Sequence, residues 1–275
     1  MHGFGRRFVL DNRDRDYLMR RMLPSVRTLS LPTRKTWGIN SAALDQGNTG
    51  TCVGHAWRNF LRCAPIKSEK TGPSPFDVYR SAVLLDPFSD NDDEANLPDG
   101  DPGLDVGTTV RAGAEAVTNA GRLKSYLWAF SLQPAIEWVL TKGPVVLGTN
   151  WYSSFQQPDA EGIVNITPNA TVVGGHAYLL RGVDTHRALA HCCNSWGDEW
   201  GKSGEFYLPF RDLERLIHED GEACTAVEKK LSALAVMPPR MTAYAGAPIV
   251  TKGRKGRVQV TPMRKPGQRV PVRAS

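Results

Sequence analysis

Residues 194–201 read Asn-Ser-Trp-Gly-Asp-Glu-Trp-Gly and directly follow an apolar run, 187–193, that has the composition of a β-strand. A second apolar run, 174–182, is bounded by glycine and predicts a strand that begins at His176. A histidine that opens one strand and an asparagine that closes its neighbour can face each other across the pair. Asn194 would then accept a hydrogen bond from one imidazole nitrogen and fix the tautomer of His176.

A glycine-rich turn leads into a predicted helix further upstream. Residues 45–51 read Asp-Gln-Gly-Asn-Thr-Gly-Thr, and apolar residues then recur with the helical period at Val53, Ala56, Trp57, Phe60 and Leu61. Cys52 therefore lies at the start of a helix, with Thr51 as its candidate N-cap. Unpaired N–H groups and the positive end of the helix dipole favour a thiolate there, ionised near neutral pH if a histidine approaches. The alternative is a small buried apolar side chain.

Together these motifs resemble the papain-like cysteine peptidases, which carry an Asp/Asn-Gln-Gly turn before a helix-borne Cys, a His-Ala strand and an Asn-Ser-Trp-Gly segment followed by Trp-Gly. His176 and Asn194 follow Cys52 by about 120 and about 140 residues, close to the spacing of roughly 130–150 given for this family. The resemblance runs from about Trp37 to about Ala226, and a Gly-Pro-Val strand entry supports its middle.

The resemblance implies a role for each matching catalytic position. Cys52 would be the nucleophile that attacks a peptide carbonyl and forms a thioester. His176 would hold the thiolate as an ion pair, protonate the leaving amine and then activate water, while Asn194 orients its ring. Gln46 would donate its side-chain N–H to the oxyanion, together with the backbone N–H of Cys52.

Three further positions are implied in substrate binding. Gly107 falls where the family pairs a glycine-rich strand with the substrate backbone, and Gly175 leaves little side-chain bulk at the edge of the cleft. Trp196 would shield the hydrogen bond between His176 and Asn194 from water.

The sequence also departs from the family pattern. Thr49 and Val53 replace a usual cysteine and a usual aromatic residue on either side of the nucleophile. Only 51 residues precede Cys52, so we do not expect a long inhibitory leader, although a short N-terminal segment could cover the cleft.

The resemblance predicts an α+β papain-like fold of two lobes with the active cleft between them. The helical lobe is expected to hold Cys52 and helices near 109–120 and 134–141. The antiparallel β-rich lobe is expected to hold strands at 145–150, 176–183, 187–193 and 205–208, followed by a helix at 212–219.

Charge and composition divide the chain into three regions. We predict an arginine-rich N-terminal segment at 1–36, a peptidase domain at 37–236 and a basic tail at 237–275. The tail holds nine basic residues and no acidic one after Pro238, whereas the whole chain has a formal net charge of +6. Proline and glycine make the tail an extended segment. It would either contact nucleic acid or another polyanion through 240–273 or stay solvated without a fixed partner.

Metal and other base candidates are weaker. The stretch 86–105 holds eight acidic residues, but Ala95 stands where a calcium loop needs glycine. Alternation along a strand would direct Cys192 and Cys193 to opposite faces. His55 lies one turn from Cys52 and has no partner asparagine. We therefore expect no metal and no cofactor.

The leading hypothesis is a cysteine-type peptidase that acts on protein or peptide substrates. Two alternatives stay open: a weak or inactive papain-fold protein that its basic tail docks to a polyanion or larger assembly, and an acyltransferase that uses the same thioester. Five cysteines, no secretory signal and no membrane span predict a cytoplasmic protein in a reducing compartment, with association with a virion or phage open.

Overall fold

The computed structural model describes residues 3–23, 31–39, 41–66, 72–87, 106–121, 123–228, 249–252 and 258–261. The chain divides into two compact units, Met1–Ala235 and Val236–Ser275.

The strands of the first unit are β1 (Arg6–Arg7), β2 (Arg34–Thr36), β3 (Thr108–Thr109), β4 (Leu123–Ala129), β5 (Val145–Tyr152), β6 (Val172–Asp184), β7 (Leu189–Cys193), β8 (Glu205–Pro209) and β9 (Glu222–Glu228). Its α-helices are α1 (Cys52–Arg62), α2 (Pro75–Leu85), α3 (Val110–Asn119), α4 (Leu132–Thr141) and α5 (Phe210–His218). Short 3-10 helices occur at η1 (Asn12–Asp16), η2 (Met19–Met22) and η5 (Ser153–Phe155).

An antiparallel sheet forms the centre of the first unit. Its strands follow the order β4-β9-β5-β6-β7-β8, and β2 pairs with the far end of β6. In this register His176 pairs with Thr149 of β5, and Leu179 pairs with Cys193 of β7. The residue after β7 is Asn194, so the sheet carries His176 and Asn194 on neighbouring strands.

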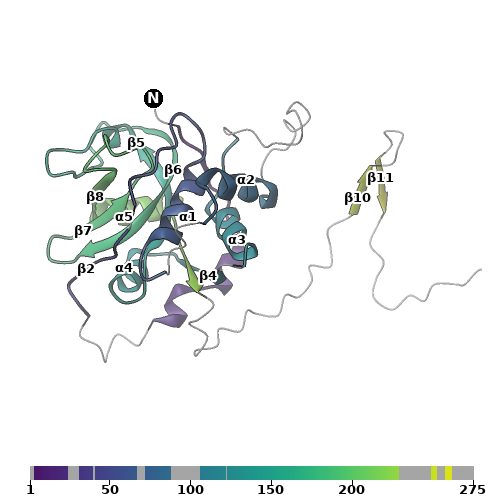
Figure 1. The fold of residues 1–275 in the computed structure, drawn as a ribbon, viewed down its shortest axis with the longest axis horizontal. Helices are drawn as coiled ribbons and strands as arrows, with labels where there is room; N and C mark the ends of the chain where they lie inside the picture. The colour runs from purple at the N-terminus through teal and green to yellow at the C-terminus, as the bar shows by residue number, and fades with distance from the viewer. Residues whose placement is uncertain are drawn as a thin grey trace, which may run out of the picture. The chain divides into compact units, whose positions relative to one another are not determined.

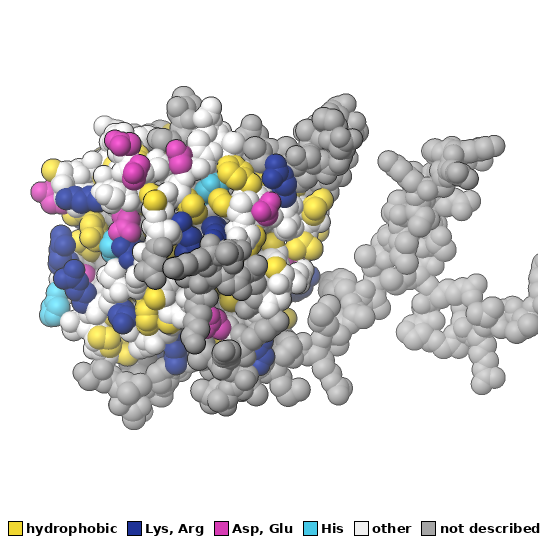
Figure 2. Space-filling view, viewed as in Figure 1, with side chains coloured by type: hydrophobic (Ala, Val, Ile, Leu, Met, Phe, Trp, Pro, Cys, Tyr) yellow, Lys and Arg dark blue, Asp and Glu magenta, His cyan; other side chains and the backbone are white. Residues whose placement is uncertain are grey.

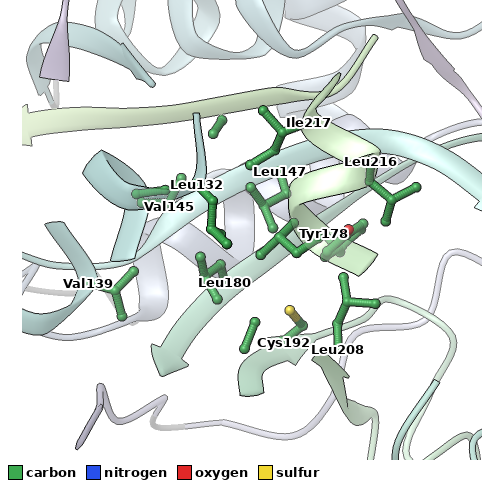
Figure 3. Close-up of a cluster of buried hydrophobic side chains, with 14 of the residues drawn as sticks. Leu132, Val139, Val145, Leu147, Tyr178, Leu180, Cys192, Leu208, Leu216 and Ile217 are labelled. Carbon is green, nitrogen blue, oxygen red and sulfur yellow. The ribbon is translucent and has the colours of Figure 1, made fainter. Parts of the chain in front are cut away.

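Alternation along the strands gives the sheet two buried faces. On β6, Tyr178 and Leu180 belong to one apolar cluster, whereas Ala177 and Leu179 belong to the other. Helices α1 and α3 cover the second face, and α2 packs against both helices (Figure 1). Helices α4 and α5 pack on the first face, where Figure 3 shows the side chains of both helices among those of β5–β8.

The predicted α+β class, helices with an antiparallel sheet, is confirmed. The helices expected near 109–120 and 212–219 are α3 and α5, and the four predicted strands are β5–β8. The sequence analysis did not predict α2, β4 or β9, although β4 and β9 extend the sheet beyond β5.

One lobe assignment is wrong. The helix expected near 134–141 is α4, which packs with the strands instead of the helices around Cys52. Its apolar residues Leu132, Ile136 and Val139 follow the helical period and contact the face of the sheet that holds Leu180. In the chain α4 lies between β4 and β5, which belong to the same sheet. The connections to these strands are short, so α4 packs on that sheet.

The N-cap of α1 differs in detail from the prediction. Thr51 occupies the N-cap position, but its side chain does not cap the helix. Its hydroxyl lies 2.7 Å from the hydroxyl of Thr49 and 3.2 Å from Nδ1 of His55. The Thr51 side chain therefore does not occupy the N–H groups in the first turn of α1, which can bind other partners.

The arginine-rich residues near the N-terminus belong to the first unit. Strand β1 pairs with β3, and both η2 and η1 contact β4. On the face shown in Figure 2, basic and acidic side chains are interspersed and neither sign covers a large continuous area. The division of the chain into three regions remains a prediction.

The second unit contains an antiparallel pair of strands, β10 (Ile249–Lys252) and β11 (Val258–Thr261). The other residues of the predicted basic tail lie outside the described part of the chain. Within the described ranges, no helix combines the length and apolar character that crossing a membrane requires.

The contact between α1 and α2 yields a stability prediction. A Cβ on Gly54 would lie 2.2 Å from the Pro75 carbonyl oxygen and 2.7 Å from Cβ of Tyr79. We expect Gly54→Ala to lower the free energy of unfolding by about 1–3 kcal/mol, because the backbone of α2 must move. Urea unfolding measures this change.

Gly38→Ala is the matched control, because a Cβ there meets nothing within 4 Å. It should change the free energy of unfolding by less than about 0.5 kcal/mol. Equal effects of the two substitutions would contradict the close packing of α1 on α2.

Candidate active site

Cys52 is the first residue of α1 and is fully buried. Burial raises the pKa of its thiol to about 11, although backbone groups of Ala177, Gly5 and Val53 and the charge of Arg6 act in the opposite direction. The expectation of a thiol ionised near neutral pH is therefore wrong for this conformation. Desolvation outweighs the helix N-terminus because no water reaches the sulfur.

His176 and Asn194 lie in hydrogen-bond contact. Nε2 of His176 is 2.7 Å from Oδ1 of Asn194, and the backbone N–H of Ser195 donates to the same oxygen at 2.8 Å. An amide oxygen only accepts, so Nε2 carries the proton of the neutral imidazole. Nδ1 is then the nitrogen that can take a proton from a thiol.

Aromatic rings enclose this hydrogen bond. The ring of Trp196 lies 4.9 Å from that of His176, and the ring of Trp151 lies 4.7 Å away. His176 and Asn194 are both fully buried. Such surroundings exclude water and strengthen the hydrogen bond.

The Cys52 thiol lies against β6 at the residue that follows His176. The backbone of Ala177, the residue after His176, hydrogen-bonds towards the Cys52 thiol. Cys52 and Ala177 also pack in the same apolar cluster. The structure thus places the helix start against the strand that carries the histidine.

Gln46 is buried beside these residues with its amide fixed in one orientation. Its Oε1 accepts a hydrogen bond from the Ser195 hydroxyl at 2.6 Å. Its Nε2 donates to the carbonyl oxygens of Thr49 and Gly3, at 2.7 Å and 3.1 Å. The side chain therefore presents an N–H to a carbonyl oxygen, as a donor to an oxyanion must.

The acceptor Gly3 belongs to a stretch of chain that crosses the site, residues Gly3–Arg7, which we call the N-terminal segment. Gly3 donates to the carbonyl of Gly47 at 3.2 Å, and the backbone N–H of Gly5 faces the Cys52 thiol. The ring of Phe4 packs edge-on against His176 and Trp196, at 6.0 Å and 5.9 Å. The segment thus covers the thiol and the imidazole.

The two remaining predicted glycines contact this segment. Gly107 has a φ of +70°, and a Cβ there would lie 2.7 Å from the Gly5 carbonyl oxygen, which accepts from the N–H of Thr108 at 2.8 Å. A Cβ on Gly175 would lie 2.3 Å from the carbonyl oxygen of Arg6. Six of the seven predicted site residues therefore contact one stretch of backbone, and Asn194 joins them through its hydrogen bond with His176.

The sequence analysis left the role of the N-terminal residues open and missed Phe4 and Arg6. The alternation of Gly3, Phe4, Gly5 and Arg6 is the available signal, because glycines allow a backbone to approach Gly50 and Gly107 closely.

The other candidates have structural partners. Nδ1 of His55 lies 3.0 Å from the Thr51 carbonyl oxygen, and burial lowers the pKa of His55. Cys192 and Cys193 pack in different apolar clusters, as strand alternation predicts, and His191 lies 2.7 Å from Glu205.

A cluster of metal ligands is likewise absent from the described part of the chain. In the described ranges, no group of three or more His, Cys, Asp or Glu side chains is arranged to hold a metal ion. Nearly all of the acidic stretch 86–105 lies outside those ranges. The five cysteines are buried and form no disulfide.

Comparison with known proteins identifies a relative in sequence. No protein-family model matches the chain. An uncharacterized peptidase C1-like protein of Acanthamoeba polyphaga mimivirus is 26% identical over 202 residues, which make up 61% of this chain and 64% of that protein. The chain therefore matches less than two thirds of the length of this relative.

Solved structures of cysteine proteases share the architecture. Xylellain from Xylella fastidiosa superposes with a TM-score of 0.65 at 17% identity, over 82% of this chain and 96% of its own. Procathepsin L2 from the larval midgut of Tenebrio molitor gives 0.56 at 17% identity, over 82% and 78%. The Carica candamarcensis protease CMS1MS2, in complex with E-64, gives 0.51 at 14% identity, over 72% and 99%. The chain thus has the papain-like fold that its motifs predict, and it is similar to the papain-like cysteine peptidases in sequence and in architecture.

Proposed function

We propose that this chain is a cysteine-type peptidase with Cys52 as nucleophile. The observation that carries the proposal is the pair of hydrogen bonds on Oδ1 of Asn194, from Nε2 of His176 and from the Ser195 N–H. They fix the tautomer that leaves Nδ1 as the proton acceptor, next to the strand position that contacts the thiol.

The reaction follows from these positions. The Cys52 proton moves to Nδ1 of His176 while the sulfur attacks the peptide carbonyl carbon, and Gln46 donates to the oxygen that becomes negative. The C–N bond breaks as Nδ1 returns the proton to the leaving amine, which leaves a thioester. Water then loses a proton to Nδ1 and attacks the thioester, releasing the acid and restoring the thiol.

We further propose that the described conformation is latent. The N-terminal segment occupies the place of a substrate. The Gly3 carbonyl oxygen accepts the hydrogen bond from Nε2 of Gln46, and Gly5 lies against Cys52. A pKa near 11 keeps the thiol neutral at physiological pH. Turnover therefore requires the segment to leave, which readmits water and removes the desolvation that raises the pKa.

The sequence analysis leaves four further possibilities, which separate experiments test. They are transfer of the acyl group to an amine other than water, a binding role without turnover, contact of the tail with a polyanion, and a cytoplasmic location. Product analysis with added amines would detect acyl transfer, and salt-sensitive retention on DNA or RNA would detect the tail contact.

Latency predicts how fast Cys52 reacts. Iodoacetamide should label Cys52 slowly in the full chain at pH 7.5, and Arg6→Ala should accelerate labelling at least about tenfold. The substitution removes the hydrogen bonds from Arg6 to Glu222 and to the Asp220 carbonyl oxygen, which anchor the N-terminal segment, and so destabilises the closed state. Mass spectrometry of the labelled peptide measures the rate.

Arg13→Ala is the control, because Arg13 is exposed and its partner is Asp11 instead of Glu222. It should not change the labelling rate. Equally slow labelling of Cys52 in the Arg6→Ala chain would contradict latency by the N-terminal segment.

Peptide hydrolysis tests the nucleophile. In the full chain carrying Arg6→Ala, we expect a fluorogenic peptide mixture to be hydrolysed, and Cys52→Ala should abolish turnover because no thioester can form. Cys63→Ala, at the other end of α1, should retain turnover. Hydrolysis that survives Cys52→Ala rejects the assignment, as does an inactive Arg6→Ala chain whose Cys52 labels readily.

The oxyanion donor has its own signature. Gln46→Ala in the same background should lower kcat by about 10²–10³-fold with little change in KM, because the lost hydrogen bond forms mainly in the transition state. Asn48→Ala, exposed in the same turn, should leave both constants near their starting values. A Gln46→Ala chain with unchanged kcat would remove Gln46 from the mechanism.

A further inference from the structure

Arg6 is held in a buried pocket next to the candidate active site. Its Nε donates to Oε2 of Glu222 at 2.9 Å, and another guanidinium nitrogen donates to the carbonyl oxygen of Asp220. The Arg6 side chain is only 2% exposed, and that of Glu222 only 8%. We call this the guanidinium pocket and define it by Val110, Gly148, Gly175, Glu222 and the Asp220 carbonyl.

The pocket exists because two strand positions lack side chains. A Cβ on Gly148 would lie 2.5 Å from Cγ2 of Val110 and 3.1 Å from both Nε of Arg6 and Oε2 of Glu222. A Cβ on Gly175 would lie 3.3 Å from Cδ of Arg6. Any larger residue at Gly148 would therefore occupy the space that the guanidinium fills.

Glu222 makes this pocket selective for a cation. It lies at the start of β9, inside the protein, where an ionised carboxylate without a partner is costly. The guanidinium satisfies it through Nε and satisfies the Asp220 carbonyl through a second nitrogen. Two acceptors at separate positions match the fork of an arginine better than the single charged nitrogen of a lysine.

The position of the pocket along the cleft identifies the part of a substrate that would reach it. Gly5, which faces the thiol, is the neighbour of Arg6 on one side and of Phe4 on the other. Phe4 packs against His176, the group that returns its proton to the leaving amine. The guanidinium pocket therefore lies on the opposite side of the sulfur, where the acyl part of a substrate binds.

We propose that the guanidinium pocket is a specificity site for substrates, and that it selects peptides with an arginine on the acyl side within three residues of the scissile bond. In this view Arg6 fills a substrate subsite while the enzyme is latent. This proposal rests on the proposed peptidase function, because a specificity site requires a substrate. Binding to the pocket can nevertheless be tested without turnover.

The test measures peptide binding to the full chain with Arg6→Ala, which empties the pocket, and Cys52→Ala, which prevents turnover. Three sets of peptides place one arginine, citrulline or leucine in turn at each of the three positions before the scissile bond. Citrulline has the shape of arginine without its charge, so it isolates the interaction with Glu222. Calorimetry gives the Kd of each peptide, and circular dichroism verifies that each variant is folded.

At one position we expect the arginine peptide to bind at least about tenfold more tightly than its citrulline and leucine counterparts. Adding Glu222→Gln should remove this difference, whereas Glu214→Gln, an exposed glutamate on α5, should preserve it. Equal binding of the arginine and citrulline peptides at all three positions overturns the proposal and leaves Arg6–Glu222 as a structural ion pair only. An arginine preference that persists in Glu222→Gln overturns it as well.

Replacement variants and a separate hydrolysis assay complete the test. If Arg6→Ala does not fold, Arg6→Gln replaces it, and if Glu222→Gln does not fold, the comparison of arginine with citrulline decides alone. Hydrolysis is measured separately in the chain that retains Cys52. Selective binding without hydrolysis would reject the peptidase and keep the pocket, whereas hydrolysis without arginine preference would keep the peptidase and reject the pocket.

Discussion

The hydrogen bond from Nε2 of His176 to Oδ1 of Asn194 is the interaction on which the site depends. It exists because β6 and β7 pair in a register that brings His176 near the residue that follows β7. Side chains alternate along strands, so a shift of one residue would remove His176 from its contacts with Trp151 and Trp196 and from Asn194. Burial of both residues among aromatic rings then holds the tautomer in place.

The same burial makes the thiol unreactive in the described conformation. A cysteine at a helix N-terminus near a histidine has the usual surroundings of a low pKa. Here the N-terminal segment displaces water from the sulfur and from the donor of Gln46, and desolvation prevails. The groups that would act on a substrate, the Cys52 thiol and the Gln46 amide, are thus the ones that the N-terminal segment contacts in the latent state. The buried pair Arg6–Glu222 anchors that segment.

Local patterns in the sequence predicted much of the fold and of the candidate site. The helical period after Cys52, the glycine-bounded run at His176 and the segment from Asn194 each predicted an element that the structure contains. They could not place α4, because an apolar helix face fits either side of a sheet. They also could not give the ionisation of Cys52, which depends first on burial in the folded chain, or reveal Glu222, whose partner Arg6 lies far from it in the sequence.

Direct titration of the Cys52 thiol tests the central claim, that the N-terminal segment keeps a competent site neutral. NMR of the full chain labelled with ¹³C at the cysteine Cβ, assigned by comparison with Cys52→Ala, reports thiolate formation at each pH. The account predicts that Cys52 stays a thiol up to about pH 9 and ionises around the pKa of about 11. A Cys52 thiolate already formed at about pH 5–6, typical of an open cysteine–histidine pair, would contradict it.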